Sequence, residues 1–137
     1  MKFKMINSLL IVLCIFSCAP DPINYEIKLN IIDNVYYDKK NNEPYTGRIF
    51  STYDNGKIKL EGLLKNGIKH GDFIYWHENG KKSWFGHFNN GKKMGSWIYW
   101  TYDGQKYLEE NYNNDIKDGL FIEWHDNGIK KQECSFE

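Results

Sequence analysis

Histidine side chains are the first candidates for chemistry in this chain, because neutral imidazole is the commonest metal ligand in proteins. His77 and His125 occupy equivalent positions of a repeated unit and lie 48 residues apart. If each unit adds two strands to a sheet, the two side chains are about 20 Å apart. Zinc–nitrogen bonds are about 2 Å long, so the two histidines cannot share an ion. We therefore predict no metal site.

Carboxylate and thiol groups give no stronger case for catalysis. Glu61, Glu109 and Glu133 share one position of the unit, and such neighbours lie about 10 Å apart, outside the spacing of about 6.5–9.5 Å in inverting glycosidases. Cys134 has no evident base, which favours a structural thiol. The glycine-rich turns open no helix and so form no phosphate loop. We predict a protein without catalytic residues and without a cofactor; an envelope hydrolase is the disfavoured alternative.

These positions belong to a unit of 24 residues that recurs along the chain. A constant period of about 20–50 residues is typical of repeat proteins. Two series of glycines and one of tryptophans keep the period: Gly47, Gly71, Gly95 and Gly119; Gly56, Gly80, Gly104 and Gly128; Trp76, Trp100 and Trp124.

Turn dipeptides divide each unit into two strands. Asn55-Gly56 and Asn66-Gly67 in the first unit, and their equivalents in later ones, are flanked by aromatic and β-branched residues, which is the strongest local signal for a hairpin. No apolar period of 3.6 residues follows residue 20. The sequence thus predicts an all-β fold, an elongated and twisted antiparallel meander of stacked β-hairpins.

The loop at Gly56 decides which residues share a face of the sheet. A three-residue loop with Gly56 left-handed places the columns of Phe50, Thr52, Leu60, Gly62 and Leu64 on one apolar face, whereas a slip of one residue would invert the second strand. This face includes the tryptophan column as a structural core, and its glycines allow rings to approach closely.

The opposite face is then the candidate binding surface. Tyrosine, tryptophan and arginine dominate binding hot spots, and tyrosine loses little conformational entropy when it is ordered. In the predicted register this surface consists of Phe73, Tyr75, Trp97 and Tyr99.

The units, written N-G-K-x-x-x-E/F-G-x-x-x-N-G-x-x-x-G-x-W/F-I-x-W, resemble the bacterial variant of the membrane-occupation-and-recognition-nexus (MORN) repeat. Proteins built from this repeat are often labelled YwqK-type antitoxins. The resemblance covers residues 35–137 and implies stacked hairpins in an elongated sheet. It implies no activity, because the repeat is a scaffold. Glu110 and Cys134 stand in the column where Gly62 and Gly86 are glycine, a departure that predicts looser packing toward the C-terminus.

The N-terminus has the pattern of an export signal. Lys2 and Lys4 precede the apolar residues 6–16, which are too few for a transmembrane helix of about 20 residues. The following Ser17-Cys18 resembles a bacterial lipobox, so we predict a lipoprotein signal peptide at residues 1–17 and lipidation of Cys18. A plain secretory signal is the alternative. Residues 18–34 then form the lipidated N-terminus, a tether and a capping strand, which the alternation of Ile27, Leu29 and Ile31 predicts.

Cleavage leaves 16 basic and 18 acidic residues, a net charge of −2, which gives no electrostatic footprint for nucleic acid. We predict an exported, non-enzymatic lipoprotein, anchored to the inner or outer membrane of a bacterial cell envelope. It would bind a macromolecule there, with a protein favoured over a glycan. An antitoxin or immunity protein that neutralises a cognate toxin is the alternative function.

Overall fold

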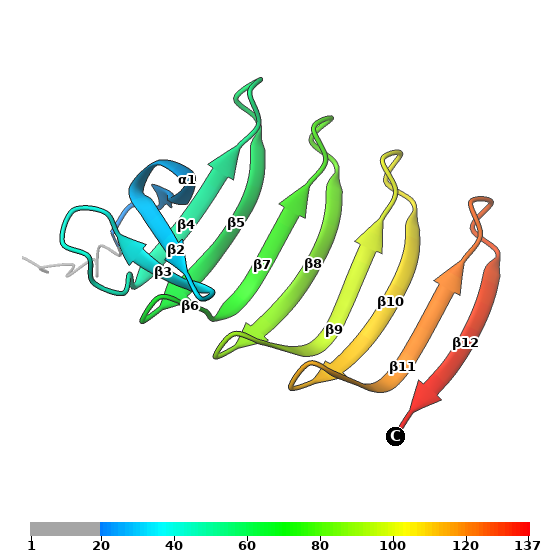
Figure 1. Cartoon of the computed structure of the whole chain (residues 1–137). Helices are drawn as coiled ribbons and strands as arrows, with labels where there is room; N and C mark the ends of the chain where they lie inside the picture. The colour runs from blue at the N-terminus through cyan, green and yellow to red at the C-terminus, as the bar shows by residue number, and fades with distance from the viewer. Residues whose placement is uncertain (1–19) are drawn as a thin grey trace, which may run out of the picture.

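The computed structural model describes residues 20–137 and is all-β, as the sequence predicts. Figure 1 shows one long, open, twisted sheet of hairpins that follow one another along the chain. Within the described residues this sheet has ten strands in the order β1-β4-β5-β7-β8-β9-β10-β11-β12, with β6 paired to β5, and β2 and β3 form a separate two-stranded sheet. The predicted signal peptide and Cys18 lie outside these residues.

The elements in chain order are β1 (Ile23–Asn24), α1 (Tyr25–Lys28), β2 (Leu29–Ile32), β3 (Val35–Asp38), β4 (Gly47–Thr52), β5 (Ile58–Lys65), β6 (Ile68–Lys69), β7 (Gly71–Trp76), β8 (Lys82–Asn89), β9 (Lys92–Trp100), β10 (Lys106–Asn113), β11 (Ile116–Trp124) and β12 (Lys130–Phe136).

Two kinds of turn alternate along the sheet. At one end the loop holds three residues, since the Tyr53 N–H donates to the Lys57 carbonyl at 2.9 Å and Gly56 is left-handed with φ 81°. At the other end Asn66 and Gly67 both have positive φ, as a two-residue type I′ turn requires. The predicted three-residue loop is therefore confirmed.

The register predicted for the second strand of each hairpin is wrong. Thr52 pairs with Ile58, as the loop requires, but Ser51 pairs with Leu60, so Lys59 is an extra residue in a β-bulge. The same shift recurs in the next three hairpins, where the extra residues are Ser83, Tyr107 and Lys131. Because a shift of one residue exchanges the two faces, Leu60 and Gly62 lie with Ile49 and Ser51 rather than with Phe50 and Thr52.

The core is a row of large and small residues that crosses the sheet. The expectation that glycines accept rings is confirmed: a Cβ at Gly62 would overlap the Phe73 ring, and one at Gly86 would overlap the Trp97 ring. Where no second layer covers a sheet, rings lying over a neighbouring glycine bury apolar area within one layer. In strand order, the row is Ile49, Gly62, Phe73, Gly86, Trp97, Glu110, Phe121 and Cys134.

An N-terminal cap, defined here as residues 23–38, closes the first end of the sheet. β1 adds to β4 in parallel, whereas β2 pairs with β3 and does not extend the main sheet. Leu29 is buried in the core, and Tyr36 packs against it. Ile27, part of the alternation that predicted the capping strand, lies in α1 instead. The cap covers one face of the sheet at its N-terminal end only (Figure 1).

Candidate binding surface

The structure divides the predicted binding surface. Phe73 is fully buried and Trp97 is 3% exposed, so the expectation that they face a partner is wrong. Tyr75 and Tyr99 are half-buried. All four belong to the face that carries the core, because the bulge brings Trp84, Gly86 and Phe88 to the same side. We call this the aromatic face.

Ring contacts run along the aromatic face from hairpin to hairpin. Tyr75 stacks on Trp84 with ring centroids 5.9 Å apart, and Trp84 stacks on Trp97 at 5.3 Å. Phe88 meets the Trp97 ring edge-on at 4.9 Å. These geometries are those that aromatic pairs prefer, so the half-buried Tyr75 ring is held by its neighbours before any partner binds.

Three lysines with the 24-residue period also lie on the aromatic face. The Lys69 ammonium is 5.0 Å from the centroid of the Phe88 ring, and that of Lys93 is 4.3 Å from the Trp97 ring. The Lys117 ammonium is 5.0 Å from the Phe121 ring. Burial, helped by the charge of Lys93, lowers the pKa of Lys69. The constant period of these lysines is a sequence signal that pointed to this face, and our sequence reasoning missed it.

A buried carboxyl interrupts the aromatic face where the unit departs from glycine. The Lys117 ammonium lies 2.5 Å from the Glu110 carboxylate, and the Tyr112 hydroxyl donates to it at 2.7 Å. Burial and the Glu110 charge both raise the pKa of Tyr99, to about 12. Tyr99 is therefore a neutral hydrogen-bonding group at physiological pH, near the Glu110–Lys117 ion pair.

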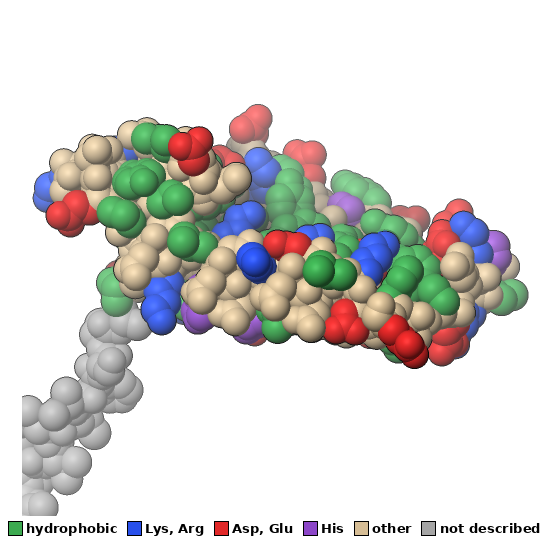
Figure 2. Space-filling model, turned by 60° about the horizontal axis from the view of Figure 1, so that its bottom comes forward, with side chains coloured by type: hydrophobic (Ala, Val, Ile, Leu, Met, Phe, Trp, Pro, Cys, Tyr) green, Lys and Arg blue, Asp and Glu red, His purple; other side chains and the backbone are tan. Residues whose placement is uncertain are grey.

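Most of the aromatic face beyond the cap has no second layer over it (Figure 2). A cavity of about 310 Å³ opens at the cap's edge and is lined by Tyr36, Lys69 and Phe88 among others. Further along, Tyr107, whose ring contacts Tyr99, is 38% exposed. The accessible part of this face thus begins beside the cap and continues toward β12.

The tryptophan column lies on the opposite face. Trp76, Trp100 and Trp124 are half-buried and pair with Lys82, Lys106 and Lys130 in equivalent registers, so successive copies are aligned as expected. The prediction that this column shares a face with Leu60, Gly62 and Leu64 is wrong, because of the bulge. The backbone carbonyls of two of these tryptophans link successive hairpins. The Tyr53 hydroxyl donates to the Trp76 carbonyl at 2.6 Å, and His77 Nε2 contacts the Trp100 carbonyl at 2.9 Å.

The groups considered for catalysis do not form a site. In the described residues no three histidine, cysteine, aspartate or glutamate side chains are placed to hold a metal ion. His77 takes part in the loop contact, and Glu109 and Glu133 each pair with a lysine of their own strand. His87 contacts the Asp72 carboxylate at 2.8 Å on the exposed surface.

Comparisons with protein-family models, curated proteins and solved structures give no match to this chain. The resemblance to the MORN-variant family stays a prediction. Among residues 20–137, no helix has the length and apolar character needed to cross a bilayer.

Proposed function

We propose that the protein is a non-enzymatic lipoprotein of the bacterial cell envelope that binds a macromolecular partner, a protein rather than a glycan, on the uncovered part of its aromatic face. The observation that carries the proposal is that half-buried, fixed rings such as Tyr99 continue past the cap without a second layer over them. The export signal and the lipobox at Cys18 support the envelope location.

The chemistry of this face favours a protein partner. Tyrosine rings supply a large contact area at low conformational cost, and the lysines lie over rings, where their charge is partly screened from solvent. The Glu110–Lys117 ion pair adds polar groups to which a partner can form hydrogen bonds. A face of this composition matches the apolar centre and polar rim of protein interfaces.

Site-specific photocrosslinking in cells tests the proposed surface. A crosslinker at Tyr107 should form an adduct with a specific protein, and the same crosslinker at Tyr102, an exposed tyrosine on a hairpin loop, should not. Tyr75→Ala/Tyr99→Ala should abolish the adduct at Tyr107 while the sheet still folds by circular dichroism. Equal adducts from both positions would refute the surface. A toxin as the captured protein would identify an immunity function.

The anchor is tested separately. Cys18→Ser should abolish incorporation of labelled palmitate and leave the precursor uncleaved by the lipoprotein signal peptidase. Labelling that persists in this variant would refute a lipid at Cys18.

A further inference from the structure

The N-terminal cap exposes three isoleucines within six residues. Ile27 is 64% exposed, and Ile31 and Ile32 are each 53% exposed. They lie outside the 24-residue repeat, so no repeat pattern requires them. The strongly exposed isoleucines of the repeats, Ile116 and Ile129, each stand alone beside a turn. Clustered exposed aliphatic residues mark a contact surface more often than scattered ones do.

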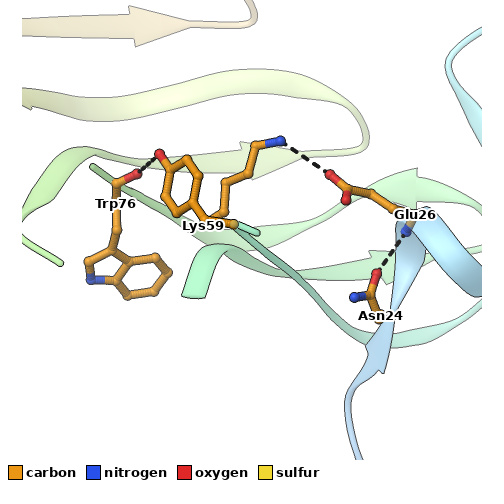
Figure 3. A network of polar contacts seen from close by, with 5 residues as sticks. Asn24, Glu26, Lys59 and Trp76 are labelled. Atoms are coloured by element: carbon orange, nitrogen blue, oxygen red, sulfur yellow. Dashed lines mark hydrogen bonds and ion pairs between the residues drawn. The ribbon is translucent and has the colours of Figure 1, made fainter. Parts of the chain in front are cut away.

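One ion pair links the cap to the main sheet, and two hydrogen bonds lie within residues 24–39. Figure 3 shows the Glu26 carboxylate of α1 facing the Lys59 ammonium of β5, 3.3 Å away, and the Asn24 side chain accepting from the Glu26 N–H at 3.1 Å. The Lys39 ammonium donates to the Ile27 carbonyl at 2.9 Å. Leu29 is also buried in the core, so the cap has a fixed orientation relative to the sheet. Ile31 and Ile32 are consecutive residues of β2 and project to opposite faces of the β2–β3 hairpin, which leaves an exposed isoleucine on each face.

The proposed lipid anchor brings this surface to the membrane. Four residues separate Cys18 from Ile23, where β1 begins, and the five Cα–Cα steps between them span at most about 18 Å when extended. The cap therefore stays beside the bilayer as long as the lipid is inserted. We infer that Ile27, Ile31 and Ile32 insert into the interfacial layer of the bilayer and form a second membrane contact beside the lipid anchor. This inference rests on the anchor in the proposed function.

The charges around the isoleucines indicate an apolar contact. Across residues 26–40, Lys28, Lys39 and Lys40 are balanced by Glu26, Asp33 and Asp38, so the cap and the residues next to it have no basic excess that would select anionic headgroups. Insertion of aliphatic side chains depends on the apolar area buried and only weakly on salt. The contact should therefore form on zwitterionic and anionic bilayers alike.

Fluorescence quenching by brominated lipids tests the contact on the lipidated chain. In a Cys134→Ser background, Ile31→Cys carries an environment-sensitive probe, and Ile129→Cys carries the same probe at the far end of the sheet. In phosphatidylethanolamine/phosphatidylglycerol vesicles with brominated chains, we expect quenching at position 31 and none at position 129. Equal signals at the two positions, or no quenching at 31, would overturn the inference.

Two further measurements separate the cap from the anchor and from electrostatics. Ile27→Ser/Ile32→Ser should remove quenching at position 31, whereas the matched control Ile116→Ser should retain it. Quenching should persist in phosphatidylcholine vesicles at high salt, and its loss there would overturn the apolar assignment. Vesicle flotation reports the anchor: protein that floats without quenching refutes the cap contact alone, and protein that does not float refutes both.

Discussion

Gly86 provides the most direct test of the packing in the aromatic row. A Cβ built on Gly86 lies less than 3.0 Å from Cδ2 and Cε2 of Trp97, closer than real Cβ contacts come. These atoms are at the fused edge of the indole, so no flexible chain end can move aside. The ring itself is 3% exposed and is held by Trp84 and Phe88. In Gly86→Ala the Trp97 ring must shift, which disturbs both neighbours.

The size of this effect follows from overpacking. Forcing one extra carbon into a packed core costs about 1–3 kcal/mol, and because three rings must move together we expect a loss of about 2–3 kcal/mol in the free energy of unfolding. Gly80→Ala is the matched control, since Gly80 has no atom within 4 Å of its built Cβ. Its left-handed φ of +89° gives backbone strain alone, about 1–2 kcal/mol.

Urea denaturation followed by intrinsic tryptophan fluorescence measures both variants. The loss of unfolding free energy in Gly86→Ala should also act through Trp97. In a double-mutant cycle, Gly86→Ala in a Trp97→Leu background should lose less than in wild type, with a coupling energy of about 1 kcal/mol or more. An additive cycle, or a loss at Gly86 below about 0.5 kcal/mol, typical of neutral surface changes, would refute the packing argument.

Three other changes test the loops and the ionisable groups. Gly80→Val should destabilise by about 1–2 kcal/mol through strain at positive φ; an unchanged melting temperature would contradict the left-handed loop. Burial raises the pKa of Glu110, but hydrogen bonds from Lys117 and Tyr112 outweigh it and hold the pKa below its ordinary value. Its contribution is therefore present above the unfolded pKa and is lost as pH falls through the folded pKa. Glu110→Gln should be less stable than wild type at neutral pH and converge with it in acid; a constant difference would contradict this. Burial raises the pKa of Tyr53 to about 12, so stability should fall as pH rises from about 10 toward 12, and Tyr53→Phe should show a smaller alkaline loss in denaturation curves. An equal loss in both proteins would contradict that role.

The sequence predicted the hairpin order and the loop type because each depends on local chemistry. Gly56 and its equivalents adopt the left-handed conformation that a three-residue loop needs, and Asn66-Gly67 meets the φ requirements of a type I′ turn. Because the unit repeats, the same two turns connect each strand to the next along the chain. These two local turns are enough to predict the elongated sheet, without any contact between residues that are far apart in the sequence.

The faces could not be predicted from the loop alone. The bulge at Lys59 shifts the register by one, and the equivalent residues Ser83, Tyr107 and Lys131 share no chemistry that marks a bulge. Such an extra residue needs no glycine when its backbone stays near the right-handed region. The sequence did contain a signal for the correct face. One column of the repeat has only large apolar members, namely Ile49, Phe73, Trp97 and Phe121. Such a column is expected to pair with the glycine column of the neighbouring strand, on the same face of the sheet.

The row that builds the core also explains why the sheet becomes accessible toward its C-terminus. Gly62 and Gly86 each accept a ring from the following strand, so Phe73 and Trp97 are buried although no second layer crosses all of the sheet. The third member of the glycine column is Glu110, which is itself buried, and Phe121, which pairs with it, is only half-buried.

The fourth member, Cys134, lies on β12 and pairs with Phe121 of β11. Rings that lie over glycines therefore bury the row near the capped end, and no such pair occurs in β10–β12 of the described sheet. If this argument holds, restoring the unit by Glu110→Gly should draw the Phe121 ring over β10 and lower its accessibility. It should also remove the ion pair with Lys117 that marks the proposed binding surface. A weaker photocrosslink at Tyr107 in a variant that folds normally would tie the exposure of this face to the loss of glycine from the repeat, and an unchanged crosslink would place recognition elsewhere on the face.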